Sequence, residues 1–380
     1  MEVLRHLVQG IGPRWAGRPG AARAADYLAE VFADLGLEVT RQDFPFVGWE
    51  VDELPTLEIR SPEPGRAAVA LMEYSGATPP DGVVGAVRPA GSATIVPGFL
   101  EWPRYDIVGD DGTLAARLIA HIGLAGWTGP AIPLVSPEPF FPFPAAILSE
   151  EDHHRFQRWL GEGKRITAHF RSRGHFDPGL TGHNVIAVLP GDSADTVVVC
   201  AHLDTAFGTP GAHNNASGVQ AMVDVARRLQ AEPRRRLTTL FAAFDASEWL
   251  YLGSRYFVAE RRAYGNLSPI VAAINLDTVA MGDQLYFLAW PETMRRRAEQ
   301  VVADLRLADR LRQIEYLGPL AGSDHYSFIQ AGIPAAEILF WPCTVYKTPA
   351  DDLSQVDAGL IELSAEIALA LIRTFEEEIQ

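Results

Sequence analysis

The chain has 380 residues, of which 48% are hydrophobic, and a formal net charge of −16. This length and apolar content allow a large buried core and suggest two domains, or one domain with a large insertion. The strong acidity argues against a nucleic acid or an anionic membrane as a partner.

Two cysteines, Cys200 and Cys343, are too few for a secreted scaffold held by several disulfides, although a single bridge is not excluded. The first 17 residues lack the apolar stretch of a signal peptide. No apolar run reaches the roughly 18 residues that a membrane span needs. We therefore expect a cytoplasmic protein.

The N-terminal part predicts one helix, one strand and then a change of character. Apolar residues recur at helical spacing over 21–35, and a strand-like segment follows at 37–44. Residues 51–182 are rich in Pro and Gly and predict a small β-rich insert, with strands at 57–60, 68–72, 145–148 and 165–171 and a helix capped by Ser149. Its loop 137–144 includes Phe140–Pro144, which could roof a cleft, but packing against its own domain is the plainer expectation.

From Asn184 onward, apolar strands alternate with amphipathic helices. Strands that are apolar on both faces predict a mostly parallel sheet covered by helices on both sides. Ligands bind such sheets at the carboxyl ends of the strands. The predicted strands are 185–189, 197–201, 240–244, 271–276, 285–290 and 335–340. The predicted helices are 217–229, 248–260, 292–305, 324–331 and 360–375.

Polar residues cluster where these predicted strands end or where a helix begins. A single His-x-Asp motif after a strand would be weak, but several clusters at strand ends favour one shared site. The clusters are His202 with Asp204, His213-Asn214-Asn215, Asp245 with Ser247 and Glu248, Asp277, Ser323-Asp324-His325, and Lys347 with Asp351.

The order of these motifs resembles the zinc aminopeptidase family, which also includes glutaminyl cyclases, the transferrin receptor and nicastrin. The matching segments include Ala201–Asp204, Gly211–Gly218, Phe244–Trp249, Asn275–Asp277, Gly322–Phe328 and Tyr346–Asp351. The resemblance implies a phosphorylase- or aminopeptidase-like α/β sandwich formed by residues 1–50 and 183–380. Residues 51–182 would then be an insert similar to a protease-associated domain.

The resemblance also implies a chemistry. Members of this family hold two zinc ions that polarise a carbonyl and activate a shared water. The matching positions assign His202 and Asp277 to one ion and Glu248 to the other. Asp204 would not bind an ion itself but would orient the ring of His202.

Three matching positions depart from the family pattern. Asn214 stands at the carboxylate that bridges both ions, and a neutral amide is a poor zinc ligand. Ser247 stands at the general base, and a hydroxyl does not accept a proton at neutral pH. Lys347, one of only two lysines in the chain, stands at the last histidine ligand. We expect its ammonium to pair with Glu248 as a substitute for the lost charge, with Asp277 as a second candidate partner; a solvated surface lysine is the alternative.

These departures lead to three hypotheses. In the first, the protein has lost two-zinc peptidase activity and keeps a polar site for binding a peptide or a small amine or amide. Under this hypothesis no zinc pair is expected, although a single zinc is compatible with the sequence. Residues assigned to that binding site are Asn214, Ser247, Asp324, Tyr346 and Lys347.

The second hypothesis is a hydrolase with one metal on His202 and Asp277, in which Glu248 becomes the general base. His213 could supply a substitute ligand there, although a loop histidine hydrogen-bonded to the backbone is the plainer expectation. The third hypothesis is a structural or receptor-like protein that acts through its surface.

Overall fold

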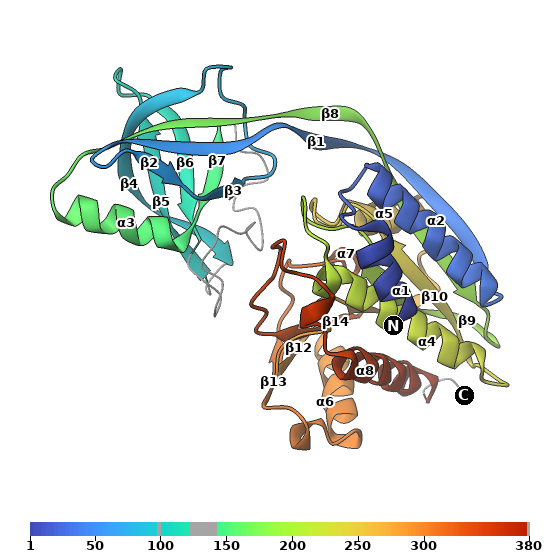
Figure 1. Cartoon of the computed structure of the whole chain (residues 1–380). Coiled ribbons are helices and arrows are strands. Elements are labelled where there is room, and N and C mark those ends of the chain that lie inside the picture. Colours follow the sequence, from blue (N-terminus) through green and yellow to red (C-terminus); the bar gives the residue numbers. More distant parts are fainter. Residues whose placement is uncertain (97–99, 122–142, 378–380) are drawn as a thin grey trace. The chain divides into compact units, whose positions relative to one another are not determined.

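The computed structural model describes residues 1–96, 100–121 and 143–377, which form two compact units (Figure 1). The first unit comprises residues 1–46, 180–343 and those from 349 onward; the second comprises 47–179 and 344–348. Two long strands, β1 (Glu38–Ser61) and β8 (Ile166–Leu189), contribute residues to both units. Of the predicted Phe-Pro loop 137–144, residues 137–142 lie outside the described part of the chain.

The first unit is built on a mostly parallel sheet, as predicted. Its strand order is β13-β12-β14-β11-β9-β10-β8. Four of these six pairings are parallel, and only β12–β14 and β10–β8 are antiparallel. The strands are β9 (Ser193–His202), β10 (Leu237–Phe244), β11 (Ile270–Leu276), β12 (Gln284–Trp290), β13 (Gln313–Leu317) and β14 (Ala335–Trp341).

Helices cover both faces of this sheet because successive strand residues point to opposite sides. Val197 and Val199 of β9 pack into one core, and Val198 and Cys200 pack into the other. The first core is closed by α1 (Glu2–Arg5), α2 (Pro19–Asp34), α4 (Ser217–Gln230), α6 (Glu292–Asp304) and α8 (Ala358–Glu376). The second core is closed by α5 (Leu252–Ala263) and α7 (His325–Gln330).

The second unit is mainly antiparallel and has its own core. Its strands pair in the order β8-β4-β5-β6-β7-β3, with β2 beside β1, and α3 packs on them through Phe156 and Trp159. The Ser149 hydroxyl accepts the N–H of Asp152, which confirms the predicted helix cap. The remaining elements are β2 (Gly65–Ala67), β3 (Val69–Leu71), β4 (Val83–Val96), β5 (Leu100–Val108), β6 (Leu114–Ala120), β7 (Ala145–Leu148) and α3 (Glu150–Gly161).

Three local predictions need correction. The helix predicted over 248–260 begins only at Leu252, because Leu250 and Tyr251 adopt left-handed backbone angles (φ 57° and 56°) that no helix accommodates. The strands predicted at 37–44 and 57–60 are parts of the single long strand β1. Strand β13 was not predicted, because it is half-exposed and alternates weakly. Among the described helices, none is both long enough and apolar enough to cross a membrane.

Candidate functional site

Several of the predicted site residues that belong to the first unit lie at the carboxyl ends of its central strands. Strands β11, β9 and β10 are parallel neighbours, so their carboxyl ends lie together. His202 is the last residue of β9, and Asp277 directly follows β11. The His202 Nε2 lies 3.5 Å from Asp277 Oδ1. The expectation that separate strand ends converge is therefore confirmed for this pair.

Asp204 connects the loop after β9 to the loop after β10. Its Oδ1 lies 3.2 Å from His202 Nδ1 and accepts the N–H of Ser247 at 3.1 Å. Its Oδ2 accepts the N–H of Glu248 at 3.0 Å. The carboxylate therefore fixes the His202 ring, as predicted, and also sets the position of the backbone that carries Glu248.

The side chain of Asn214 lies between His202 and Glu248. Its Oδ1 is 3.1 Å from His202 Nε2, and its Nδ2 donates to Glu248 Oε1 at 2.6 Å. The reverse amide orientation would place Nδ2 against an N–H and Oδ1 against a carboxylate. The neighbours therefore determine which way the amide points.

Both ring nitrogens of His202 face oxygen atoms that only accept hydrogen bonds. Nδ1 faces Asp204, and Nε2 faces Asn214 and Asp277. Burial alone would lower the pKa of His202, but the charge of Asp277 and hydrogen bonds to Asp204 and Asp277 raise it well above its ordinary value. Desolvation alone would raise the pKa of buried Asp277, but the charge and hydrogen bond of His202, the hydrogen bond from Ser323 and the charge of His213 together lower it.

Ser247 donates a hydrogen bond at the position where relatives of this kind would have their base. Its Oγ donates to Asp324 Oδ2 at 2.9 Å, and both residues are buried. Burial raises the pKa of Asp324 to about 6, against the lowering effect of His202 and of hydrogen bonds from Ser254 and Ser247. The sequence placed Asp324 in the site, and the structure brings it directly against Ser247.

His213 turns its ring toward the backbone. Its Nδ1 accepts the N–H of Ala280 at 3.1 Å, so the neutral ring carries its proton on Nε2. A protonated nitrogen has no lone pair for a metal. Burial lowers the pKa of His213 to about 4, so the ring is neutral at physiological pH. This geometry favours the backbone-bonded loop histidine over the substitute ligand.

Lys347 is buried, with 8% of its surface exposed, and lies in segment 344–348 of the second unit. Its backbone is left-handed (φ 54°), and its Nζ is 5.4 Å from the ring centre of Tyr346. A lysine in this conformation carries backbone strain of about 1–3 kcal/mol. Burial argues against a solvated surface lysine. The expected pair with Glu248 would join residues assigned to different units and stays a prediction.

Arg14 organises two loops of the site and was missed in the sequence. Its guanidinium is fully buried and donates to backbone carbonyls alone. The signal available was an arginine between Gly12-Pro13 and Gly17, turn-forming residues ahead of a helix. The acceptors are the carbonyls of Leu203 (2.7 Å), Leu7 (3.1 Å), Gly12 (3.0 Å), Pro210 (2.9 Å) and Gly211 (3.0 Å). Arg14 thereby ties the loop after His202 to the turn that carries Asn214.

Asp351 holds the same turn, Ala212–Ala216, from another direction. Its Oδ1 accepts the N–H of His213 at 2.7 Å, and its Oδ2 accepts the N–H of Asn214 at 3.1 Å. Gly211 precedes this turn with φ 63°, and a Cβ there would lie 2.3 Å from Thr205 Cγ2. Position 211 therefore requires glycine. The backbone of Asn214 is held by this turn and by Asp351, independently of the contacts of its side chain.

The residues present do not fit a pair of zinc ions. An ion shared by positions 214 and 248 would meet the Nδ2 hydrogens of Asn214, which point at Glu248. In the described part of the chain, no group of three or more His, Cys, Asp and Glu side chains is placed to hold a metal. The side chains of His202 and Asp277 are of the kinds that bind zinc, so they could hold one ion. They are only two ligands, however, and zinc prefers about three from the protein.

Buried carboxyl groups give the fold a predicted pH dependence. Burial raises the pKa of Asp245 to about 8 and that of Asp351 to about 7, from 3.8. The folded state then holds protons that the unfolded state releases, so stability falls as pH rises through 7–8. His213 works the other way, but only below its unfolded pKa of 6.5. We expect the urea midpoint to be higher at pH 6.5 than at pH 9; equal midpoints would contradict these assignments.

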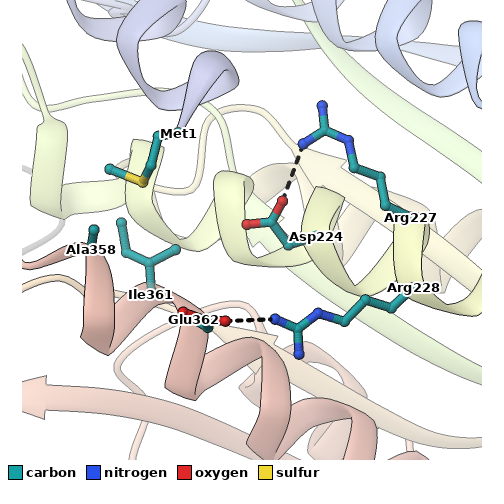
Figure 2. Close-up of a pocket in the computed structure, with 7 residues that line it drawn as sticks. All are labelled: Met1, Asp224, Arg227, Arg228, Ala358, Ile361 and Glu362. Carbon is teal, nitrogen blue, oxygen red and sulfur yellow. Dashed lines mark hydrogen bonds and ion pairs between the residues drawn. The ribbon is translucent and has the colours of Figure 1, made fainter.

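A surface pocket of about 360 Å³ lies between α4, α8 and the N-terminus (Figure 2). Arg227 pairs with Asp224 at 3.1 Å, and Arg228 pairs with Glu362 at 3.4 Å. Both arginines are thus paired within the pocket, which leaves it without a specific charge for recognising a ligand. The other lining residues are Met1, Ala358 and Ile361.

Comparison with known proteins agrees with the fold and the motif order. Residues 184–372 match peptidase family M28. The chain is 26% identical over 367 residues to a probable lipoprotein aminopeptidase, LpqL, of Mycobacterium tuberculosis. This alignment covers 85% of the chain and 69% of LpqL. It is 27% identical over 203 residues to aminopeptidase YwaD of Bacillus subtilis, covering 50% of this chain and 44% of that protein.

Solved structures share the whole architecture. The zinc aminopeptidase BSAP from Bacillus subtilis superimposes with a TM-score of 0.72 at 19% identity, covering 100% of this chain and 95% of that one. An M28 peptidase precursor from Shewanella amazonensis superimposes with a TM-score of 0.79 at 18% identity, and the match covers 99% of this chain and 92% of that one. At such identities these structures support the fold alone. Residues 184–372 therefore belong to peptidase family M28, and the resemblance to the zinc aminopeptidase family that the motifs predicted is confirmed.

Proposed function

We propose that this member of the family has lost two-zinc peptidase activity and retains a polar site that binds a peptide or a small amine or amide. The observation that carries the proposal is the Ser247 hydroxyl, which donates to Asp324 at the position of the general base. Hydrolysis needs a group there that accepts a proton from water. The proposal is supported further by Asn214, whose amide hydrogens are directed at Glu248.

The test is turnover of aminoacyl amide substrates in the presence of zinc. We expect negligible activity, because loss of a general base alone costs about 10²–10⁴-fold in rate. A working M28 aminopeptidase assayed in the same buffer is the reference. Turnover within tenfold of that reference would show that another group has taken over the role of the base, and would end the proposal.

One observation favours a second candidate, a hydrolase that uses a single metal. Asp277 Oδ1 is buried and faces His202 Nε2 at 3.5 Å, with no shorter hydrogen bond among the described residues. Two ligands of one zinc, each at about 2.0–2.2 Å, stand at comparable separations. A metal held there would supply Lewis-acid chemistry, and Glu248 would be the base. One equivalent of zinc retained after dialysis, together with zinc-dependent turnover that Glu248→Gln abolishes, would support this candidate.

A further inference from the structure

The three side chains His202, Asn214 and Glu248 form a continuous chain of contacts in the middle of the site. His202 and Asn214 are both nearly fully buried, and Glu248 is partly exposed. The two links of this chain are His202 Nε2 to Asn214 Oδ1 at 3.1 Å and Asn214 Nδ2 to Glu248 Oε1 at 2.6 Å. In each link a nitrogen donates to an oxygen, so both hydrogen bonds are directed from the His202 ring towards the Glu248 carboxylate.

The geometry points to the Asn214 amide as the built-in substitute for a shared cation: it bridges His202 and Glu248 and locks the site in a state that needs no metal. A bridging carboxylate requires positive charge on both sides of it. An amide has one accepting and one donating end, so it fits between an N–H group and a carboxylate without an added ion. This inference rests on the proposed loss of the zinc pair and explains how the remaining side chains are held.

The neighbouring contacts make the amide bridge a fixed element. The N–H of Asn214 is held by Asp351 and that of Glu248 by Asp204, so neither backbone can readily retreat. A short donor–acceptor contact between two anchored residues is therefore sensitive to replacing one atom. Asn214→Asp changes NH₂ to oxygen and would set two carboxylate oxygens against each other across this contact.

The experiment is an exchange of the two groups, measured by urea unfolding with a chelator present. We expect Asn214→Asp to lower the folding equilibrium constant by roughly 10- to 100-fold, since hydrogen bonds to charged groups contribute on that scale. Glu248→Gln alone should cost less, because the glutamine oxygen can still accept from Asn214. The double variant N214D/E248Q restores a donor facing a carboxylate at unchanged net charge. It should therefore recover most of the loss caused by Asn214→Asp.

A matched control lies on the exposed face of α6, where Gln300 Nε2 donates to Asp304 Oδ1 at 2.8 Å. Gln300→Glu and its double variant with Asp304→Asn carry the same chemical exchange in solvent, and both should change the equilibrium constant little. Additive effects of Asn214→Asp and Glu248→Gln, or an Asn214→Asp variant as stable as the wild type, would overturn the inference. If Asn214→Asp does not fold, the double variant N214D/E248Q still tests the inference: a folded double variant would support it, and an unfolded one would contradict it.

Zinc gives a second readout that does not involve turnover. Added zinc should raise the melting temperature of Asn214→Asp more than that of the wild type, because a carboxylate is a better zinc ligand than a neutral amide. Equal shifts would count against the amide as a substitute for the cation. Failure here would leave the activity test of the proposed function unaffected, since stability and turnover are measured separately.

Discussion

Replacing Arg14 by Met is expected to lower the free energy of unfolding by at least about 3 kcal/mol, because buried acceptors left without donors cost about 1–3 kcal/mol each. Five backbone carbonyls accept from this guanidinium. Those of Leu7 and Gly211 also accept the backbone N–H groups of Gly12 and Ala216. The expected cost therefore comes from the carbonyls of Leu203, Gly12 and Pro210. Burial lowers the pKa of Arg14 to about 10, with Asp351 and Asp204 opposing the shift, so the side chain is still charged at neutral pH. Urea denaturation monitored by circular dichroism measures the loss.

Two further variants make this result specific. Arg14→Lys keeps the charge but lacks the planar five-donor geometry, so it should recover only part of the stability. Arg234→Met removes an arginine that pairs with Asp192 while 78% of its side chain is exposed, and it should leave the free energy of unfolding almost unchanged. An Arg14→Met variant that unfolds at the same urea concentration as Arg234→Met would show that Arg14 does not organise the two loops.

The double variant N214D/K347H should bind zinc more tightly than the wild-type protein. It restores the bridging carboxylate and the last imidazole that the family motif contains, while His202, Asp277 and Glu248 are already present. We expect the zinc dissociation constant to fall by more than the roughly 10–100-fold associated with changes in outer-shell residues. Elemental analysis after dialysis gives the stoichiometry, and competition with a chelating dye gives the affinity.

The single variants are the controls for this gain. Asn214→Asp and Lys347→His each restore one ligand, so each should bind zinc more weakly than the double variant. Activity should stay low in all three, because Ser247 is unchanged, and adding Ser247→Glu is the step expected to raise turnover. A double variant that holds no more zinc than the wild-type protein would mean that the site differs from the family by more than these positions.

Much of the architecture could be predicted because hydrophobic periodicity depends on local sequence. The apolar strands around Val197–Ala201 and Val271–Leu276, and the helix after Ser217, follow the buried and exposed pattern of the sheet and its cover. The start of α5 could not be predicted. Residues 248–251 fit a helical pattern, but Leu250 and Tyr251 adopt left-handed backbone angles in the folded protein, and the pattern of apolar residues does not reveal these angles.

The sequence by itself determined which chemical groups are present at the site: an amide at position 214, a hydroxyl at 247 and an amine at 347. It also determined that His202 and Asp277 each follow a predicted strand, since the apolar pattern of a strand is local information. That these two strands, β9 and β11, are neighbours in the sheet was decided by the tertiary structure. Only the tertiary structure decided the partners. Asn214 donates to Glu248, His213 turns to the backbone of Ala280, and Arg14 reaches carbonyls nearly 200 positions away in sequence. Hydrogen-bond direction depends on three-dimensional neighbours, and sequence spacing does not carry that information.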